Sequence, residues 1–251
     1  MKFATWNLLS RSKTQVEAVN FLLHEEKVDV VCLQEVRGET IEYLKNSQQS
    51  DLYVECSHSY YDRRDQVYSA IISRMKPVVV VSAKFNYILP LSVLSRLSDL
   101  DYRDSGYQYN EYSVGEKTVR IFNIHLPFGA SPMIRLKILG EVLENLYVEN
   151  NVICGDFNSF GHFPWNILVN PLNGARWDEY KLHELEELKK LVAKFNLKLS
   201  VVRVVTYPSC RTHLDHIVVP ESWSAYTCNV LSKRYGSDHN IVVLEEQELI
   251  N

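Results

Sequence analysis

The chain has 251 residues, of which 46% are hydrophobic and 23% charged, a composition typical of a globular protein with a substantial core. Its formal net charge of −4 argues against a protein that binds nucleic acid through charge alone. No apolar run reaches the roughly 18 residues of a membrane-spanning helix, so we expect no membrane partner.

The cysteines and the start of the chain bear on the cellular compartment. The cysteines are odd in number and lack the CxxC spacing of zinc sites and redox motifs, so we interpret them as reduced thiols. The first residues show no signal-peptide pattern. We expect a cytoplasmic, monomeric protein that needs no protein partner. The cysteines are Cys32, Cys56, Cys154, Cys210 and Cys228.

Short apolar segments rich in Val, Ile and Phe predict the strands. Several are apolar nearly throughout, which is typical of strands covered on both faces. In chain order, the predicted strands cover residues 2–7, 28–36, 68–74, 77–83, 118–126, 151–157, 214–219 and 240–246.

Three segments have the periodicity of helices. Thr14 and Glu17 have the spacing of a capping box and precede an apolar stripe, which predicts a first helix. Ser131 and Pro132 have the residue types of an N-cap and first position, which predicts a second helix. A stripe of leucines predicts a third helix over residues 179–196.

The order of these elements indicates the fold class. Paired strands without a helix between them, as in residues 67–82, do not suit a simple alternation of strands and helices. We therefore expect an α/β fold in which two packed mixed sheets are flanked by helices, formed by a single domain over residues 1–251. The Tyr-rich residues 83–117 predict a long hairpin or loop.

Polar side chains stand where several of these strands begin or end. Taken singly, each is more simply explained as a turn residue, a helix cap or a core histidine. Taken together, they form an oxygen-rich set, and oxygen ligands suit Mg²⁺ or Mn²⁺. Histidine beside carboxylate suits proton transfer or stabilisation of a charged transition state, so the set fits cleavage of a phosphate ester. Its members are Asn7, Glu35, His125, Asp156, Asn158, Asp215, Asp238 and His239.

A series of short motifs connects these residues. TWN, LQE, SAIISR, NIHL, GDFN, LDHI and SDH follow one another between Thr5 and His239. In this order, the chain resembles the endonuclease/exonuclease/phosphatase family, which includes deoxyribonuclease I-like and exonuclease III-like enzymes, and in particular its compact bacterial-type branch. The resemblance implies a four-layer α/β/β/α sandwich and metal-dependent hydrolysis of phosphoesters.

The resemblance also implies a metal site. Glu35 resembles the principal metal-binding glutamate of the family, and Asn7 the amide that supports the metal or the phosphate. Asp238 lies on the metal side. The implied cofactor is Mg²⁺ or Mn²⁺.

Catalytic roles follow in the same way. Asp156 resembles the acid that orients or deprotonates the attacking water, and Asn158 its phosphate-binding companion. His239 resembles the histidine that contacts the scissile phosphate, and Asp215 the carboxylate that fixes its tautomer. His125 resembles a second histidine found in some branches.

Departures from the family pattern narrow the range of possible substrates. Abasic-site enzymes carry a Tyr at the position of His125, an acid at that of Leu9 and a Trp-rich loop before the LDHI motif, all absent here. The Cys-Asp-Arg signature of inositide 5-phosphatases is absent as well. A nuclease acting on DNA or RNA, as an endonuclease or exonuclease, remains the best interpretation. The alternatives are a phosphomonoesterase or a lipid or inositide phosphodiesterase of the same family, and a catalytically weak module that binds nucleic acid.

Aromatic residues near the motifs are candidates for substrate binding. Phe163 and Trp165 could stack on unpaired bases, and Arg211 is a further candidate. The alternative is a hydrophobic loop packed on the edge of a sheet. The same two interpretations apply to Tyr102, Tyr107, Tyr109 and Tyr112.

Overall fold

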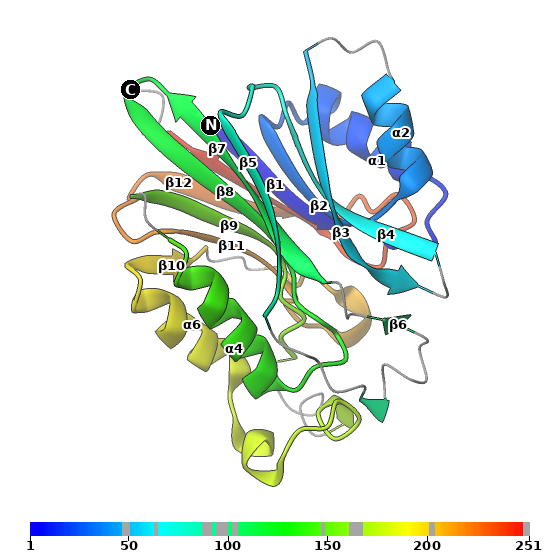
Figure 1. Ribbon diagram of the computed structural model, residues 1–251, viewed down its shortest axis with the longest axis vertical. Coiled ribbons are helices and arrows are strands. Elements are labelled where there is room, and N and C mark those ends of the chain that lie inside the picture. Colours follow the sequence, from blue (N-terminus) through cyan, green and yellow to red (C-terminus); the bar gives the residue numbers. More distant parts are fainter. Residues whose placement is uncertain are drawn as a thin grey trace.

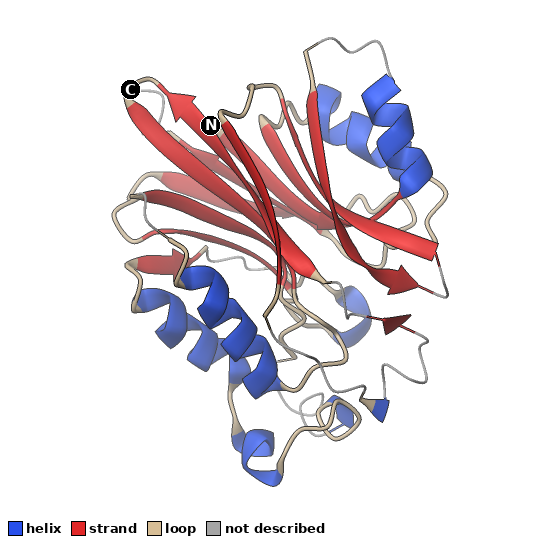
Figure 2. Cartoon of the chain, in the orientation of Figure 1, coloured by secondary structure: helices blue, strands red, loops and turns tan. Residues whose placement is uncertain are grey.

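The computed structural model describes residues 1–46, 51–62, 65–86, 92–93, 100–101, 105–146, 149–160, 168–200 and 204–247. Two β-sheets pack face to face, and helices cover the outer face of each (Figures 1 and 2). This is the four-layer α/β/β/α sandwich that the sequence predicts. No helix in these ranges has the length and apolar character needed to cross a membrane.

The first sheet has seven strands in the order β12-β13-β1-β2-β4-β3-β6. β1 and β2 run parallel and the other neighbours pair antiparallel, so the sheet is mixed. Its strands are β1 (Lys2–Asn7), β2 (Val30–Arg37), β3 (Tyr53–Asp62), β4 (Asp65–Ser73), β6 (Leu100–Asp101), β12 (Tyr226–Leu231) and β13 (Ile241–Glu246).

The second sheet has six strands in the order β10-β11-β9-β8-β7-β5. It is also mixed, because β8 and β9 run parallel and the other pairs are antiparallel. Its strands are β5 (Val79–Lys84), β7 (Gly106–Val114), β8 (Lys117–His125), β9 (Asn150–Asp156), β10 (Leu197–Leu199) and β11 (Asp215–Pro220).

The alternation of side chains along the strands divides the core into layers. Phe3 and Cys32 of the first sheet point inward and pack in one cluster with Ile121 and Val152 of the second. Each fully buried side chain of this size contributes roughly 1.5–3 kcal/mol through removal of apolar surface from water. The inner layer therefore holds the two sheets together by apolar contact.

The outer faces of the sheets are covered by helices. Trp6 and Leu33 point away from the other sheet and pack beneath the N-terminal helices. Phe122 and Ile153 do the same beneath the helices of the second sheet. The covering elements are α1 (Gln15–Asn20), the π-helix η1 (Phe21–Glu25) and α2 (Gly38–Asn46) on the first sheet, and α4 (Pro132–Leu143) and α6 (Glu184–Ala193) on the second.

The predicted elements agree with the structure at most positions. All eight predicted strands are present, and the first two predicted helices begin directly after Thr14 and Ser131. The hydroxyl of Thr14, however, donates to the carbonyl of Tyr235 and accepts no hydrogen bond from the backbone of the helix, so no capping box forms. The third helix begins later than expected, at Glu184, after the short 3₁₀ helix η2 (Trp177–Lys181).

Of the two alternatives expected for residues 83–117, a long hairpin or a loop, the structure supports the hairpin in the second half, and the loop is wrong there. That half is β7, which pairs with β5 on one side and β8 on the other. Tyr107 and Tyr109 are buried in the core beneath the helices, and Tyr112 is buried between the sheets. These three tyrosines therefore form no base-stacking surface. Tyr102 lies outside the described residues.

Candidate active site

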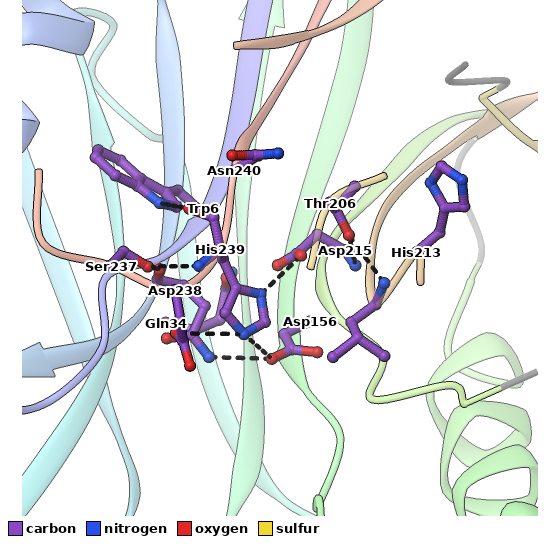
Figure 3. Close-up of polar contacts among 12 residues, drawn as sticks. Trp6, Gln34, Asp156, Thr206, His213, Asp215, Ser237, Asp238, His239 and Asn240 are labelled. Carbon is purple, nitrogen blue, oxygen red and sulfur yellow. Dashed lines mark hydrogen bonds and ion pairs between the residues drawn. The ribbon is translucent and has the colours of Figure 1, made fainter. Parts of the chain in front are cut away.

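Polar residues at strand ends of both sheets meet at one pocket. The parallel strands β8 and β9 are in register at His125 and Asp156, and β11 places Asp215 opposite Asp156. In the other sheet, Asn7 ends β1 and lies beside Gln34 of β2. The two registers bring residues far apart in the sequence to the same edge of the sandwich (Figure 3).

The pocket has a volume of about 160 Å³ and is lined by both polar and apolar residues. Asp215 is hydrogen-bonded to the ring of His239, and the other polar residues selected from the sequence line the pocket. These are Asn7, Glu35, His125, Asp156, Asn158, Asp238 and His239, and the apolar and aromatic lining residues are Leu9, Tyr60, Phe128, Phe160, Tyr207 and Leu214.

Glu35 reaches the pocket from a bulge in β2. Its backbone has a φ of +57°, a left-handed conformation that is uncommon for glutamate. Its carboxylate accepts hydrogen bonds from Nδ2 of Asn7 (3.0 Å) and the amide of Ser10 (2.9 Å). Burial raises the pKa of Glu35, but His125 together with these two donors outweighs burial and holds the pKa below its ordinary value. Glu35 is therefore a carboxylate at neutral pH.

Asp156 ends β9 and is almost fully buried. It accepts hydrogen bonds from Nδ2 of Asn7 (3.0 Å) and from the backbone amide of Asn158 (2.9 Å). Burial, supported by the charge of Asp215, raises the pKa of Asp156 to about 6, although His239 acts in the opposite direction. This carboxyl group therefore exchanges its proton close to neutral pH.

His239 is held between carboxylates on the loop before β13. Its Nδ1 donates to Oδ2 of Asp215 over 2.8 Å, and its Nε2 lies 3.9 Å from both Asp156 and Asp238 (Figure 3). Burial lowers the pKa of His239, but the charge of Asp215 and of the other two acids reverses this and raises it to about 10. The ring is therefore an imidazolium, with Nε2 directed to the pocket side.

His125, at the end of β8, also lies near Asp156. Its Nε2 is 3.7 Å from Oδ2 of Asp156, and its Nδ1 is 3.4 Å from the hydroxyl of Ser59. Tyr60 packs edge-on against the ring at a centroid distance of 5.5 Å. The two histidines therefore flank the same carboxylate.

The chemistry of the side chains fits a divalent cation. Glu35 and Asp238 offer carboxylate oxygens at the pocket, which are the donors that Mg²⁺ and Mn²⁺ prefer. None of the lining residues in the described part of the chain is lysine or arginine. Carboxylates also outnumber the histidines around the pocket, so a bound cation would offset excess negative charge. Asp156, Asp215 and His239 form a second group that could hold a metal ion, because one potential ligand atom from each lies within 4.8 Å of the other two.

Of the substrate-binding candidates Phe163, Trp165 and Arg211, only Arg211 lies within the described residues. Phe163 and Trp165 lie outside the described residues. Arg211 is exposed and follows the 3₁₀ helix η3 (Pro208–Cys210) with a φ of +51°, and it is not among the residues that line the pocket.

Several residues that support the site were missed in the sequence. Gln15 donates through Nε2 to the carbonyl of Glu35, and Thr206 accepts from the amide of Asp215. Tyr60 and Tyr207 line the pocket. No local pattern marks Gln15 or Tyr60, because their roles depend on segments that only the fold brings together. The nearness of Thr206 and Tyr207 to the LDHI motif was the one available signal.

Comparison with solved structures places the fold among known proteins. An endonuclease/exonuclease/phosphatase family protein from Leptotrichia buccalis superposes with a TM-score of 0.68 at 15% identity, covering 98% of this chain and 99% of that one. The 3′-5′ exonuclease NExo from Neisseria meningitidis gives 0.67 at 20% identity, covering 98% and 100%. D. rerio TDP2 complexed with a single-strand DNA product gives 0.62 at 14% identity, covering 98% of each chain.

At these identities the structural likeness shows the fold alone. A search of curated proteins gives no match. The sequence itself matches the model of the Endonuclease/Exonuclease/phosphatase family over residues 4–239, nearly the whole chain. With the shared fold, this match shows that the chain belongs to the endonuclease/exonuclease/phosphatase family.

Proposed function

We propose that this protein is a divalent-cation-dependent phosphodiesterase that hydrolyses nucleic acid. The family to which it belongs consists of phosphoester hydrolases. The observation that carries the proposal is the arrangement around His239, whose Nδ1 donates to Asp215 while its Nε2 faces Asp156 across the pocket. An imidazolium and a carboxylate with a pKa of about 6 at one small pocket supply a hydrogen-bond donor and a proton acceptor for attack on a phosphate.

Glu35 and Asp238 would hold Mg²⁺ or Mn²⁺, and Asn7 would orient Glu35. The amide nitrogen of Asn7 donates to Glu35, and its oxygen accepts from the amide of Leu9 over 3.0 Å. When bound, the cation supplies charge that polarises a non-bridging phosphate oxygen and offsets charge on the leaving oxygen.

Asp156 would accept a proton from the attacking water. Its pKa of about 6 is close to the working pH, which is the condition under which a general base is most effective. Asn7 donates to one carboxylate oxygen and the amide of Asn158 to the other, so the carboxylate has a fixed orientation.

His239 would donate a charge-assisted hydrogen bond from Nε2 to a phosphate oxygen. Asp215 accepts from Nδ1, so it fixes the orientation of the ring and stabilises its charge. His125 would act as a second donor beside the same carboxylate. The imidazolium of His239 places positive charge where the negative charge of the transition state develops.

Nucleic acid is the proposed substrate class because structurally similar proteins have been solved with bound DNA. One neighbouring structure is a 3′ phosphatase, NExo, bound to a product DNA hairpin, and another is TDP2 with a single-strand DNA product. The apolar and aromatic lining residues of the pocket would contact the sugar next to the scissile phosphate. A phosphomonoesterase or a lipid phosphodiesterase would use the same polar residues with a different leaving group.

A panel of substrates tests the proposal. The purified full chain is assayed in Mg²⁺, in Mn²⁺ and in EDTA on single- and double-stranded DNA, RNA, bis-p-nitrophenyl phosphate, a phosphomonoester and sphingomyelin. Glu35→Gln removes the charge of the proposed cation ligand. Glu39→Gln is the matched control, because Glu39 has an exposed side chain on α2 and pairs only with Arg37 among the described contacts.

We expect metal-dependent cleavage of nucleic acid that is lost in Glu35→Gln and kept in Glu39→Gln. Turnover of the monoester or lipid alone would reassign the substrate. Absence of turnover on every substrate would contradict an enzymatic function and favour a binding module.

A further inference from the structure

Thr206 stands where the two sheets meet behind the pocket. Its hydroxyl oxygen accepts hydrogen bonds from the amides of Leu214 (2.9 Å) and Asp215 (3.1 Å), at the start of β11 in the six-stranded sheet. Its carbonyl accepts from the amide of Asn240 (2.7 Å), which directly precedes β13 in the seven-stranded sheet. Thr206 is fully buried. Thr206 is thus hydrogen-bonded to the backbone next to one strand of each sheet.

The amides that bond to Thr206 belong to Asp215 or lie next to Asp215 and His239, the two residues joined by the hydrogen bond that orients the imidazolium. Asp215 belongs to one sheet, and His239 precedes the last strand of the other, so their 2.8 Å hydrogen bond spans the two sheets (Figure 3). The side chain of Asn240 adds a second link, because its Nδ2 donates to the carbonyl of Val205 over 2.9 Å. The relative position of Asp215 and His239 is therefore fixed through residues 205–206.

Tyr207 continues this segment onto the face of the histidine. Its ring lies 4.8 Å from the ring of His239, tilted by 50°, and it lines the pocket. Two backbone hydrogen bonds with Thr212 close a hairpin around the 3₁₀ helix η3, which fixes the backbone of Tyr207. Burial raises the pKa of the Tyr207 phenol, and so does the neighbouring carboxylate of Asp238. The phenol is therefore protonated and faces an acid of the pocket.

We propose that Thr206 and Tyr207 are positioning residues of the active site: Thr206 sets the distance between Asp215 and His239, and Tyr207 holds the imidazole ring from its open face. Neither residue exchanges a proton with the substrate. Their effect on turnover passes through the orientation of His239, and this role rests on the proposed function.

Substitutions at Thr206 separate its hydroxyl from its shape. Thr206→Val keeps the branched shape but leaves the amides of Leu214 and Asp215 without an acceptor, whereas Thr206→Ser keeps the acceptor. With bis-p-nitrophenyl phosphate and Mg²⁺, we expect kcat to fall about 10- to 100-fold in Thr206→Val with KM little changed. Thr206→Ser should retain kcat within about twofold.

A readout without substrate makes the test independent of the proposed function. In the full chain labelled with ¹⁵N-histidine, the Nδ1–H of His239 gives a resonance that depends on its hydrogen bond to Asp215. This resonance should weaken or shift in Thr206→Val and persist in Thr206→Ser. Tyr207→Ala should shift the ring resonances of His239, while Tyr207→Phe and the control Tyr43→Phe, at a half-exposed tyrosine on α2, leave them nearly unchanged.

Each outcome decides the matter. A wild-type His239 resonance and wild-type kcat in Thr206→Val would overturn the role of Thr206, and unshifted ring resonances in Tyr207→Ala would overturn that of Tyr207. If Thr206→Val does not fold, Asn240→Ala takes its place, because it removes the side-chain hydrogen bond to the carbonyl of Val205. A weakened or shifted His239 resonance in Asn240→Ala supports the fixing of Asp215 and His239 through residues 205–206, and a wild-type resonance contradicts it. If the wild type cleaves no phosphoester but the resonances respond as expected, the proposed function fails and the positioning role stands.

Discussion

Gly155 lies against the carbonyl of Ile124 across the parallel pair of β8 and β9, so closely that a Cβ at this position would overlap the carbonyl oxygen. This contact stands one residue before Asp156 and one before His125. The glycine of the GDFN motif is thus needed for close packing of the two strands that present these side chains.

We predict that Gly155→Ala destabilises the protein by at least about 1–3 kcal/mol, the range for overpacking in a tight core, because the blocking atoms belong to the backbone. Denaturant unfolding followed by circular dichroism measures the change. Gly140→Ala is the matched control. Gly140 lies inside α4 with open space at its Cβ, so alanine should stabilise by roughly 0.5–1 kcal/mol. Equal stability of the two variants would contradict the prediction.

Asn123 forms a polar link across the apolar layer between the sheets. From β8 it donates to the carbonyls of Leu33 and Ala70, both over 2.9 Å, and accepts from Nε2 of Gln34 over 2.7 Å. Asn123→Leu leaves these groups buried without partners, so we expect a loss of about 2–4 kcal/mol in the free energy of unfolding. Asn229→Leu, at an exposed position of β12, should change it by less than about 0.5 kcal/mol. A small effect of Asn123→Leu would mean that the groups find new partners.

Asp215→Asn tests the role of the carboxylate behind His239. The substitution keeps the size of the side chain but removes the charge that holds the pKa of His239 at about 10. We expect that pKa to fall, measured by NMR titration, and kcat to drop about 10³- to 10⁴-fold, as when a histidine loses its orienting carboxylate in other hydrolases. Asp178→Asn, at an exposed side chain of η2, serves as the control. An unchanged pKa of His239 would exclude Asp215 as its orienting partner.

His216 makes stability depend on pH. Burial, with the nearby His213, lowers its pKa to about 3, so the folded protein holds His216 neutral where the unfolded chain would bind a proton. Above the unfolded pKa of about 6.5, His216 is neutral in both states and costs the folded protein nothing. As the pH falls from about 6.5 toward 3, only the unfolded chain binds the proton, so the free energy of unfolding decreases by about 1.4 kcal/mol per pH unit. Unfolding curves between pH 7 and pH 4 should show a shallower slope for His216→Gln than for the wild type. The exposed His24→Gln should leave the slope unchanged.

Much of the fold could be predicted because most strands are apolar along their whole length. β7 was missed for a physical reason: Gln108 and Asn110 are buried polar residues within it, so its composition is that of a loop. β3 contains many polar and aromatic residues and is specified by its long pairing with β4, which no local pattern shows.

The residues of the candidate site could be recognised in the sequence because polar residues at the ends of apolar strands are conspicuous. The residues that hold them in place could not be recognised in this way. Gln15 and Thr206 act through hydrogen bonds to segments that are distant along the chain or across the sheets, and the left-handed turn at Glu35 has no sequence signal. The residues that meet at the pocket were therefore predictable, and the hydrogen bonds that fix their geometry were not.

The amide nitrogen of Asn7, on one sheet, touches Glu35 of its own sheet and Asp156 of the other. The polar groups of the pocket are thus shared between two sheets, whose apolar layer is crossed by the hydrogen bonds of Asn123. A lateral slip of one sheet by an ångström would break these contacts while leaving every strand pair intact. Turnover should consequently fail at lower temperature than the circular dichroism of the strands, and the enzyme's activity would serve as a gauge of sheet alignment.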